Sequence, residues 1–200
     1  MKNIFYLIFG ILITSCSSSK LEQRVVIDFL IDNPFFKNEE VRIVAEQPIN
    51  RLLSLEYYEK AYEDRNIRLG DMIRISPESY ASFKWPVDTI EVKILKEIYK
   101  NEPNKQLWKK NDFRKTEIKL IPSDKILETI NDISHQYFGK KGLEISKPLI
   151  TSNKKYAFLF VRTFNIGIPF GHSIVKAILM ENINGKWKII ETFIDPNVIS

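Results

Sequence analysis

The last third of the chain most constrains the fold, because strand-like runs follow one another there with turn residues between them. Residues 155–162 form a continuous apolar run with charged ends. The run is too short for most helices and rich in aromatic residues, which favours a strand buried on both faces. Residues 173–180 are predicted to form the next strand, and residues 186–193 alternate between polar and apolar side chains. Asn184-Gly185 between them accepts positive φ at both positions, as tight hairpins require. These patterns predict a C-terminal β-meander.

Alternation also assigns side chains to the faces of these strands. In residues 173–180, one face carries Lys176 together with Ile174, Ile178 and Met180. In residues 186–193, a strict period of two predicts that the core-facing residues are Trp187, Ile189 and Phe193. Residues 143–146 alternate between apolar and polar side chains as well. Pro148 follows closely, which predicts a short or edge strand.

The region before the meander mixes helical and strand-like patterns. Helices are predicted over residues 20–31, where Leu21, Val25 and Phe29 recur every four residues, and over 51–65 and 124–137. Residues 41–45 fit a strand or a helical turn, of which the strand is favoured. Residues 116–121 are predicted to form a strand, and residues 67–75 a hairpin or bent strand. Residues 90–98 fit both a helix and a strand, because Ile90, Ile94 and Ile98 have helical spacing while Ile90, Val92 and Ile94 alternate.

The fold predicted from these elements is a single α+β domain over residues 21–200. It consists of an antiparallel sheet that ends in the meander and is packed by two to four helices. The chain shows no internal repeat, no low-complexity tract and no long linker, so one domain is expected.

The N-terminus has the pattern of an export signal. A short basic start is followed by the apolar residues 4–13. As a helix this run would span about 15 Å, about half of the hydrocarbon core of a bilayer. It is therefore predicted to be a signal peptide and not a transmembrane anchor.

The end of the apolar run, Ile13-Thr14-Ser15-Cys16, resembles a bacterial lipobox. The resemblance implies a lipid on the Cys16 thiol, removal of residues 1–15 as a lipoprotein signal peptide, and acylation of the new amino group. Residues 16–20 would then be the lipidated cysteine and a short tether. The alternative is an ordinary secretory peptide with an accidental cysteine. Cys16 is the single cysteine, so a lipidated chain has no disulfide and no thiol nucleophile.

Three stretches, residues 146–150, 153–158 and 184–190, together with the N-terminus, resemble small lipoproteins of Bacteroidetes-type bacteria. Closing hairpins with Asn-Gly-Lys-Trp also occur in NTF2-like and other antiparallel folds. The resemblance implies an envelope lipoprotein. The resemblance implies no catalytic residues, because the family has no established activity.

One apolar connection, residues 164–172, joins two strands of the meander. Two interpretations are open: the loop covers the sheet edge, or it forms a binding loop, since functional residues concentrate on loops. The residues of this candidate binding loop are Phe164, Ile166, Gly167, Ile168, Phe170, Gly171 and His172.

Charge and histidine content limit the remaining site classes. The net charge is +5, and residues 93–119 hold nine Lys or Arg against four acids. This segment is either a solvated surface or a contact for anionic lipid head groups. The two histidines, His135 and His172, fall on different elements, and no metal or cofactor motif is present. Nucleic acid is not an expected partner of an exported chain.

These observations predict a membrane-anchored envelope lipoprotein, a non-enzymatic binding or scaffolding protein. Its expected partners are the membrane, through lipid on Cys16, and a protein of the envelope. The anchor could lie in the inner or outer membrane and face the periplasm or the surface. Two alternatives are an immunity-type protein against a periplasmic toxin and a small envelope hydrolase that uses the loop around His172.

Overall fold

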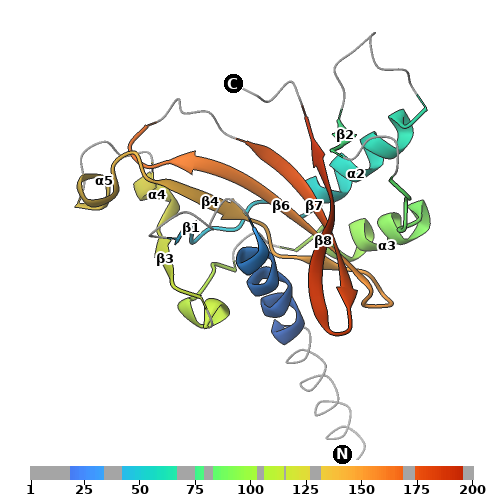
Figure 1. Ribbon diagram of the computed structural model, residues 1–200, viewed down its shortest axis with the longest axis horizontal. Coiled ribbons are helices and arrows are strands. Elements are labelled where there is room, and N and C mark those ends of the chain that lie inside the picture. Colours follow the sequence, from blue (N-terminus) through green and yellow to red (C-terminus); the bar gives the residue numbers. More distant parts are fainter. Residues whose placement is uncertain are drawn as a thin grey trace, which may run out of the picture.

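The computed structural model describes residues 19–33, 42–66, 75–78, 83–102, 106–114, 116–126, 132–168 and 174–195. A mixed sheet forms its centre (Figure 1), with strand order β2-β8-β7-β6-β4-β1-β3 and β5 paired to β6. The strands are β1 (Arg42–Ala45), β2 (Ser76–Pro77), β3 (Ile118–Ile121), β4 (Lys141–Ile145), β5 (Leu149–Ile150), β6 (Tyr156–Asn165), β7 (Val175–Ile183) and β8 (Lys186–Ile194). The helices are the N-terminal helix (residues 19–32), α2 (Leu52–Asp64), α3 (Thr89–Tyr99), the 3-10 turn η3 (Lys110–Phe113), α4 (Ser123–Ile126) and α5 (Asp132–Tyr137).

The predicted C-terminal meander is confirmed. Strands β6, β7 and β8 pair in antiparallel order, and residues Ala157 to Val161 of β6 are buried on both faces. The turn between β7 and β8 has positive φ at Asn184 (52°) and Gly185 (81°), the conformation that an Asn-Gly hairpin favours. The N–H of Gly185 also donates to Asn182 Oδ1 at 2.9 Å.

A β-bulge in β8 overturns one prediction, that Trp187, Ile189 and Phe193 share a face. Met180 pairs with Ile189 but Leu179 pairs with Glu191, so Ile190 is an extra residue in β8. One extra residue reverses the alternation beyond it. Trp187 and Ile189 therefore pack on one side of the sheet and Phe193 on the other.

The sheet is mostly antiparallel, as predicted, but its other end contains parallel pairs. Strand β1 runs parallel to both β3 and β4, while the remaining pairs are antiparallel. Parallel neighbours need long crossover connections, which leave no local turn signal in the sequence. Residues 143–146 were predicted to form a short or an edge strand; β4 is short, with five residues, and it lies between β1 and β6 and not at an edge. The predicted α+β class holds.

Helices cover both faces of the sheet, and each face has its own apolar core. On one face the N-terminal helix buries Val25, Val26, Phe29 and Leu30 against alternate residues of β6 and β7. On the other face α2 and α3 pack against the remaining residues of the same strands. Figure 1 shows the N-terminal helix crossing the middle of the sheet, with α2 and α3 gathered at one side.

The structure resolves the ambiguity of residues 90–98 in favour of helix α3. Asp88 begins this helix, because its side chain accepts the N–H of Glu91 at 2.8 Å. The isoleucines with helical spacing lie on its outer face, however, and the exposed fractions of Ile90, Ile94 and Ile98 are 69%, 42% and 61%.

Part of the predicted helix over residues 124–137 is described, as α4 and α5; Ile126 is buried and His135 is exposed. Residues 127–131, and most of the predicted bent strand over 67–75, lie outside the described residues.

Candidate binding cavity

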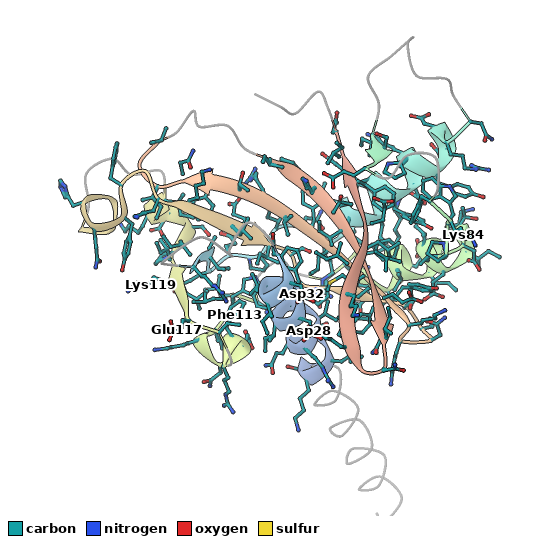
Figure 2. The ribbon with its side chains drawn as sticks, viewed as in Figure 1. Asp28, Asp32, Lys84, Phe113, Glu117 and Lys119 are labelled. Carbon is teal, nitrogen blue, oxygen red and sulfur yellow. The ribbon has the colours of Figure 1, made fainter. Side chains whose placement is uncertain are left out.

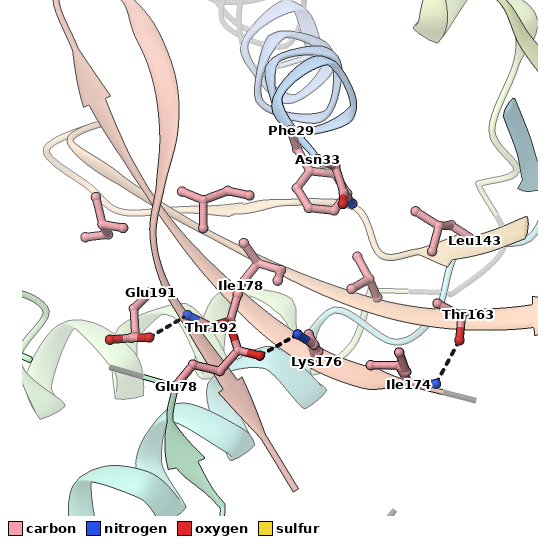
Figure 3. A pocket seen from close by; sticks show the side chains of 13 residues that line it. Phe29, Asn33, Glu78, Leu143, Thr163, Ile174, Lys176, Ile178, Glu191 and Thr192 are labelled. Carbon is pink, nitrogen blue, oxygen red and sulfur yellow. Dashed lines mark hydrogen bonds and ion pairs between the residues drawn. The ribbon is translucent and has the colours of Figure 1, made fainter. Parts of the chain in front are cut away.

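A cavity of about 720 Å³, here called the face cavity, opens on the sheet face that carries the N-terminal helix (Figure 3). It lies beside the last turn of that helix, where Phe29 and Asn33 contribute to its lining. Most of its wall is apolar and comes from Phe29, Leu143, Val161, Ile174, Ile178, Ile189 and Ile190. Its polar lining consists of Asn33, Glu78, Thr163, Lys176, Glu191 and Thr192.

Glu78, Lys176 and Thr192 meet at one edge of the face cavity. Lys176 Nζ forms an ion pair with Glu78 Oε1, and the hydroxyl of Thr192 donates to Glu78 Oε2 (Figure 3). The adjacent carboxylate of Glu191 accepts the backbone N–H of Thr192 at 2.9 Å. The edge therefore presents one cation, the Glu78 carboxylate and a hydroxyl beside an apolar wall, while Glu191 is almost fully buried.

Strand pairing holds Glu78 at this edge. Ser76 and Pro77 of β2 pair with Ile194 and Phe193 at the end of β8, and the N–H of Glu78 donates to the carbonyl of Thr192 at 2.9 Å. Lys176 reaches the same place from β7, because its side chain points to the same face as Ile174 and Ile178.

Electrostatics keep the Glu78 carboxyl ionised. Burial raises its pKa, but the hydrogen bonds from Lys176 and Thr192 and the positive charge of Lys176 together outweigh burial, so the pKa of Glu78 lies below its usual value of 4.5. At neutral pH the edge therefore holds a charged Glu78–Lys176 pair that can both accept and donate hydrogen bonds.

The described part of the candidate binding loop lies away from the face cavity. Ile166 is fully buried among core residues that include Ile43, Ala45, Ile121 and Ile126, and Phe164 packs against the same cluster. Gly167 has φ 71° and donates its N–H to the carbonyl of Ile126 at 3.0 Å, while Ile168 is partly exposed. The remaining residues, Phe170, Gly171 and His172, lie outside the described residues. A binding role for this loop stays a prediction.

A second cavity, the helix-start cavity, lies at the other end of the N-terminal helix and is polar. It measures about 780 Å³, and its lining includes Ser19, Glu22, Glu102, Trp108 and Lys147. Arg51, which is almost fully buried, contacts Glu22 Oε1 at 3.6 Å and Glu102 Oε2 at 3.1 Å. Arg51 thereby connects the N-terminal helix to the segment that follows α3.

Burial dominates the titration of two groups in the helix-start cavity. It raises the pKa of Glu22, although the nearby Arg51 opposes this, and it lowers the pKa of Lys147, although the nearby Asp112 opposes that. Lys147 Nζ also lies 3.4 Å from the centre of the Trp108 ring, a cation–π contact that favours the charged amine. These groups are engaged with one another, so the cavity has the character of a structural ion-pair network.

Within the described ranges, no group of three or more His, Cys, Asp or Glu residues could hold a metal ion. The helices among these same residues include none that is long and apolar enough to cross a membrane. Cys16 lies outside the described residues, so lipidation there stays a prediction from the sequence.

Comparisons of this chain with protein-family models, with curated proteins and with solved structures gave no match. The site is therefore defined by its own geometry. Sequence reasoning missed Glu78 and Thr192, which meet only through the pairing of β2 with β8. The one usable signal was Lys176, a charged residue on the apolar face of a predicted strand.

Proposed function

We propose that this chain is a lipid-anchored, non-enzymatic protein of the bacterial envelope that binds a small apolar molecule with one hydrogen-bonding end. The observation that carries this proposal is the face cavity, with an apolar wall and a polar edge at Glu78, Lys176 and Thr192.

The dimensions and lining of the face cavity fit a small-molecule site. Such sites typically measure about 300–1,000 Å³ and are mostly apolar, with a few polar groups that fix the orientation of the ligand. In the face cavity the apolar body of a ligand would lie along Ile178, Val161 and Leu143. Its polar end would meet the Glu78–Lys176 pair. The carboxylate and the amine of that pair neutralise each other, which suits binding without a chemical step.

The position of the face cavity also suits an anchored protein. Cys16 and Ser19 can be at most about 11 Å apart, because three residues of extended chain span no more. The N-terminal helix then runs for about 20 Å to Asn33. The cavity thus lies at the end of this helix that is distant from the proposed lipid.

The test is a titration with the apolar fluorescent probe N-phenyl-1-naphthylamine, followed by displacement with fatty acids and fatty alcohols of increasing chain length. Ile174→Gln places an amide in the cavity wall and is expected to weaken probe binding about tenfold. Ile90→Gln is the control, because Ile90 is at least as exposed as Ile174 but belongs to α3, on the opposite side of the sheet. This variant should leave probe binding unchanged. Equal probe affinity in the two variants would remove the face cavity as the binding site.

A second pair of variants tests the polar edge. Lys176→Gln removes the cation at the cavity, whereas Lys155→Gln removes a lysine that pairs with Glu181 at 3.3 Å elsewhere on the sheet. The first variant should change the preference between a fatty acid and the alcohol of the same length, and the second should not. If neither variant changes that preference, the polar edge does not contact the ligand.

A further inference from the structure

We propose that the surface around the first turn of the N-terminal helix lies against anionic lipid head groups. This surface, the anchor-end patch, consists of Lys20, Leu107, Lys109 and Lys110. The inference rests on the proposed lipid anchor at Cys16, and it adds a second contact with the same membrane.

The placement of the patch follows from contacts at the start of the N-terminal helix. Ser19, Leu107 and Lys109 line the same helix-start cavity. Gln23 Nε2 donates to Asp112 Oδ1 at 2.9 Å, which joins the helix to η3. Because Ser19 lies within about 11 Å of Cys16 along the chain, a lipid on Cys16 brings the patch close to the bilayer surface.

The carboxylates next to the patch contact neighbouring groups, including Glu102, which is itself exposed. Glu22 and Glu102 contact Arg51, and Asp112 lies 3.8 Å from Lys147 and accepts the N–H of Lys109 at 2.9 Å. The exposed charged groups of the patch are Lys20, Lys109 and Lys110. A lysine near an anionic membrane surface strengthens partitioning about fivefold.

The patch also exposes an apolar side chain between its lysines. Leu107 is 49% exposed, while its neighbour Trp108 is buried and donates its indole N–H to the carbonyl of Ile145 at 3.0 Å. The buried tryptophan fixes the segment on the domain and leaves Leu107 facing outward. An exposed leucine flanked by lysines has the composition of surfaces that lie at the head-group boundary.

The experiment uses the lipidated chain in vesicles of phosphatidylcholine, with or without phosphatidylglycerol. Cys16 is the single cysteine, so Leu107→Cys gives one free thiol for an environment-sensitive dye once Cys16 carries lipid. Ile174→Cys is the matched control, because Ile174 is 51% exposed and lines the face cavity at the other end of the helix. Quenching by a spin label on the lipid head group reports how close each dye lies to the surface.

We expect strong quenching at position 107 that increases with phosphatidylglycerol, and little quenching at position 174 in either vesicle. Lys109→Gln with Lys110→Gln should reduce the quenching at position 107 in phosphatidylglycerol vesicles to its level in phosphatidylcholine. The matched charge control, Lys140→Gln with Lys141→Gln, alters another pair of adjacent exposed lysines, which lies at the start of β4, and should leave that quenching unchanged.

Equal quenching at positions 107 and 174, or quenching at position 107 that does not depend on phosphatidylglycerol, would overturn the inference about the patch. Neither result would bear on the proposed lipid anchor at Cys16. If the purified chain carries no lipid on Cys16, the proposed anchor is removed, and the patch is then tested in a Cys16→Ser chain, where position 107 is again the one thiol. Phosphatidylglycerol-dependent quenching in that chain would support the patch. A chain without lipid and without quenching would overturn both.

Discussion

At the scale of single residues, Gly142 is a position where the fold leaves no room for a side chain. It pairs with Phe164 across β4 and β6, and a Cβ placed on Gly142 would come within 2.3 Å of Phe164 Cζ. The aromatic ring therefore lies directly over the glycine and takes the space that a side chain would occupy. Glycine is required here for close packing and not for an unusual backbone conformation.

Gly142→Ala is accordingly expected to destabilise the protein by about 1–3 kcal/mol, the usual cost of overpacking a core. Urea unfolding measures this cost. In a Phe164→Ala background the ring is absent, so the same Gly142→Ala change should cost much less. An equal cost in both backgrounds would show that the ring does not set the requirement for glycine.

The Glu78 carboxyl gives a prediction for how the stability of the protein depends on pH. Its pKa is below 4.5 in the folded protein, because hydrogen bonds from Lys176 and Thr192 and the positive charge of Lys176 together outweigh burial. A depressed folded pKa contributes stability that is present above pH 4.5 and is lost as pH falls through the folded pKa. The difference in Tm between wild type and Glu78→Gln should therefore shrink as pH is lowered from 7 towards 3.

The control for this pH series is Glu56→Gln, which alters an exposed glutamate of α2. Its Tm should run parallel to that of the wild type over the same range. If Glu78→Gln also runs parallel to the wild type, the Glu78–Lys176 contact does not contribute to stability.

At the scale of elements, the N-terminal helix is joined to the β7–β8 hairpin by two aspartates one turn apart (Figure 2). Asp28 Oδ2 accepts the backbone N–H of Trp187 at 2.8 Å in a partly buried position. Asp32 lies 3.4 Å from Lys186, and both side chains are substantially exposed. The first contact satisfies a backbone donor next to the core, and the second is a surface ion pair.

Asp28→Ala is expected to cost about 1.5–3 kcal/mol, because the charged acceptor of a partly buried N–H is lost. Asp32→Ala should cost at most about 1 kcal/mol, as for other exposed ion pairs. Chemical unfolding of the two variants measures the difference. Similar costs for both would mean that the hydrogen bond to Trp187 does not hold the helix on the hairpin.

The same elements show what could be predicted from the sequence. The N-terminal helix and strands β6 to β8 were predictable, because their patterns and the Asn184-Gly185 turn are local. The bulge at Ile190 was not predictable, since it depends on how β7 and β8 pair. The polar edge of the face cavity was also beyond local reasoning, because Glu78 and Thr192 are 114 residues apart and meet only in the sheet.

At the scale of the whole molecule, the N-terminal helix separates two regions with different proposed roles. Its first turn borders the helix-start cavity and the anchor-end patch, and its last turn borders the face cavity. With lipid on Cys16, the basic surface would face the membrane and the face cavity would lie at the distant end. A lipid on Cys16 would therefore set how both regions are oriented relative to the membrane.

The measurement that tests this account most directly is the intact mass of the chain purified from cells fed with labelled palmitate, beside a Cys16→Ser control. We predict that the wild-type chain begins at Cys16 and carries labelled lipid there, whereas the Cys16→Ser chain carries no label. A wild-type chain that retains residues 1–15, or that has an unmodified Cys16 thiol, would contradict the account.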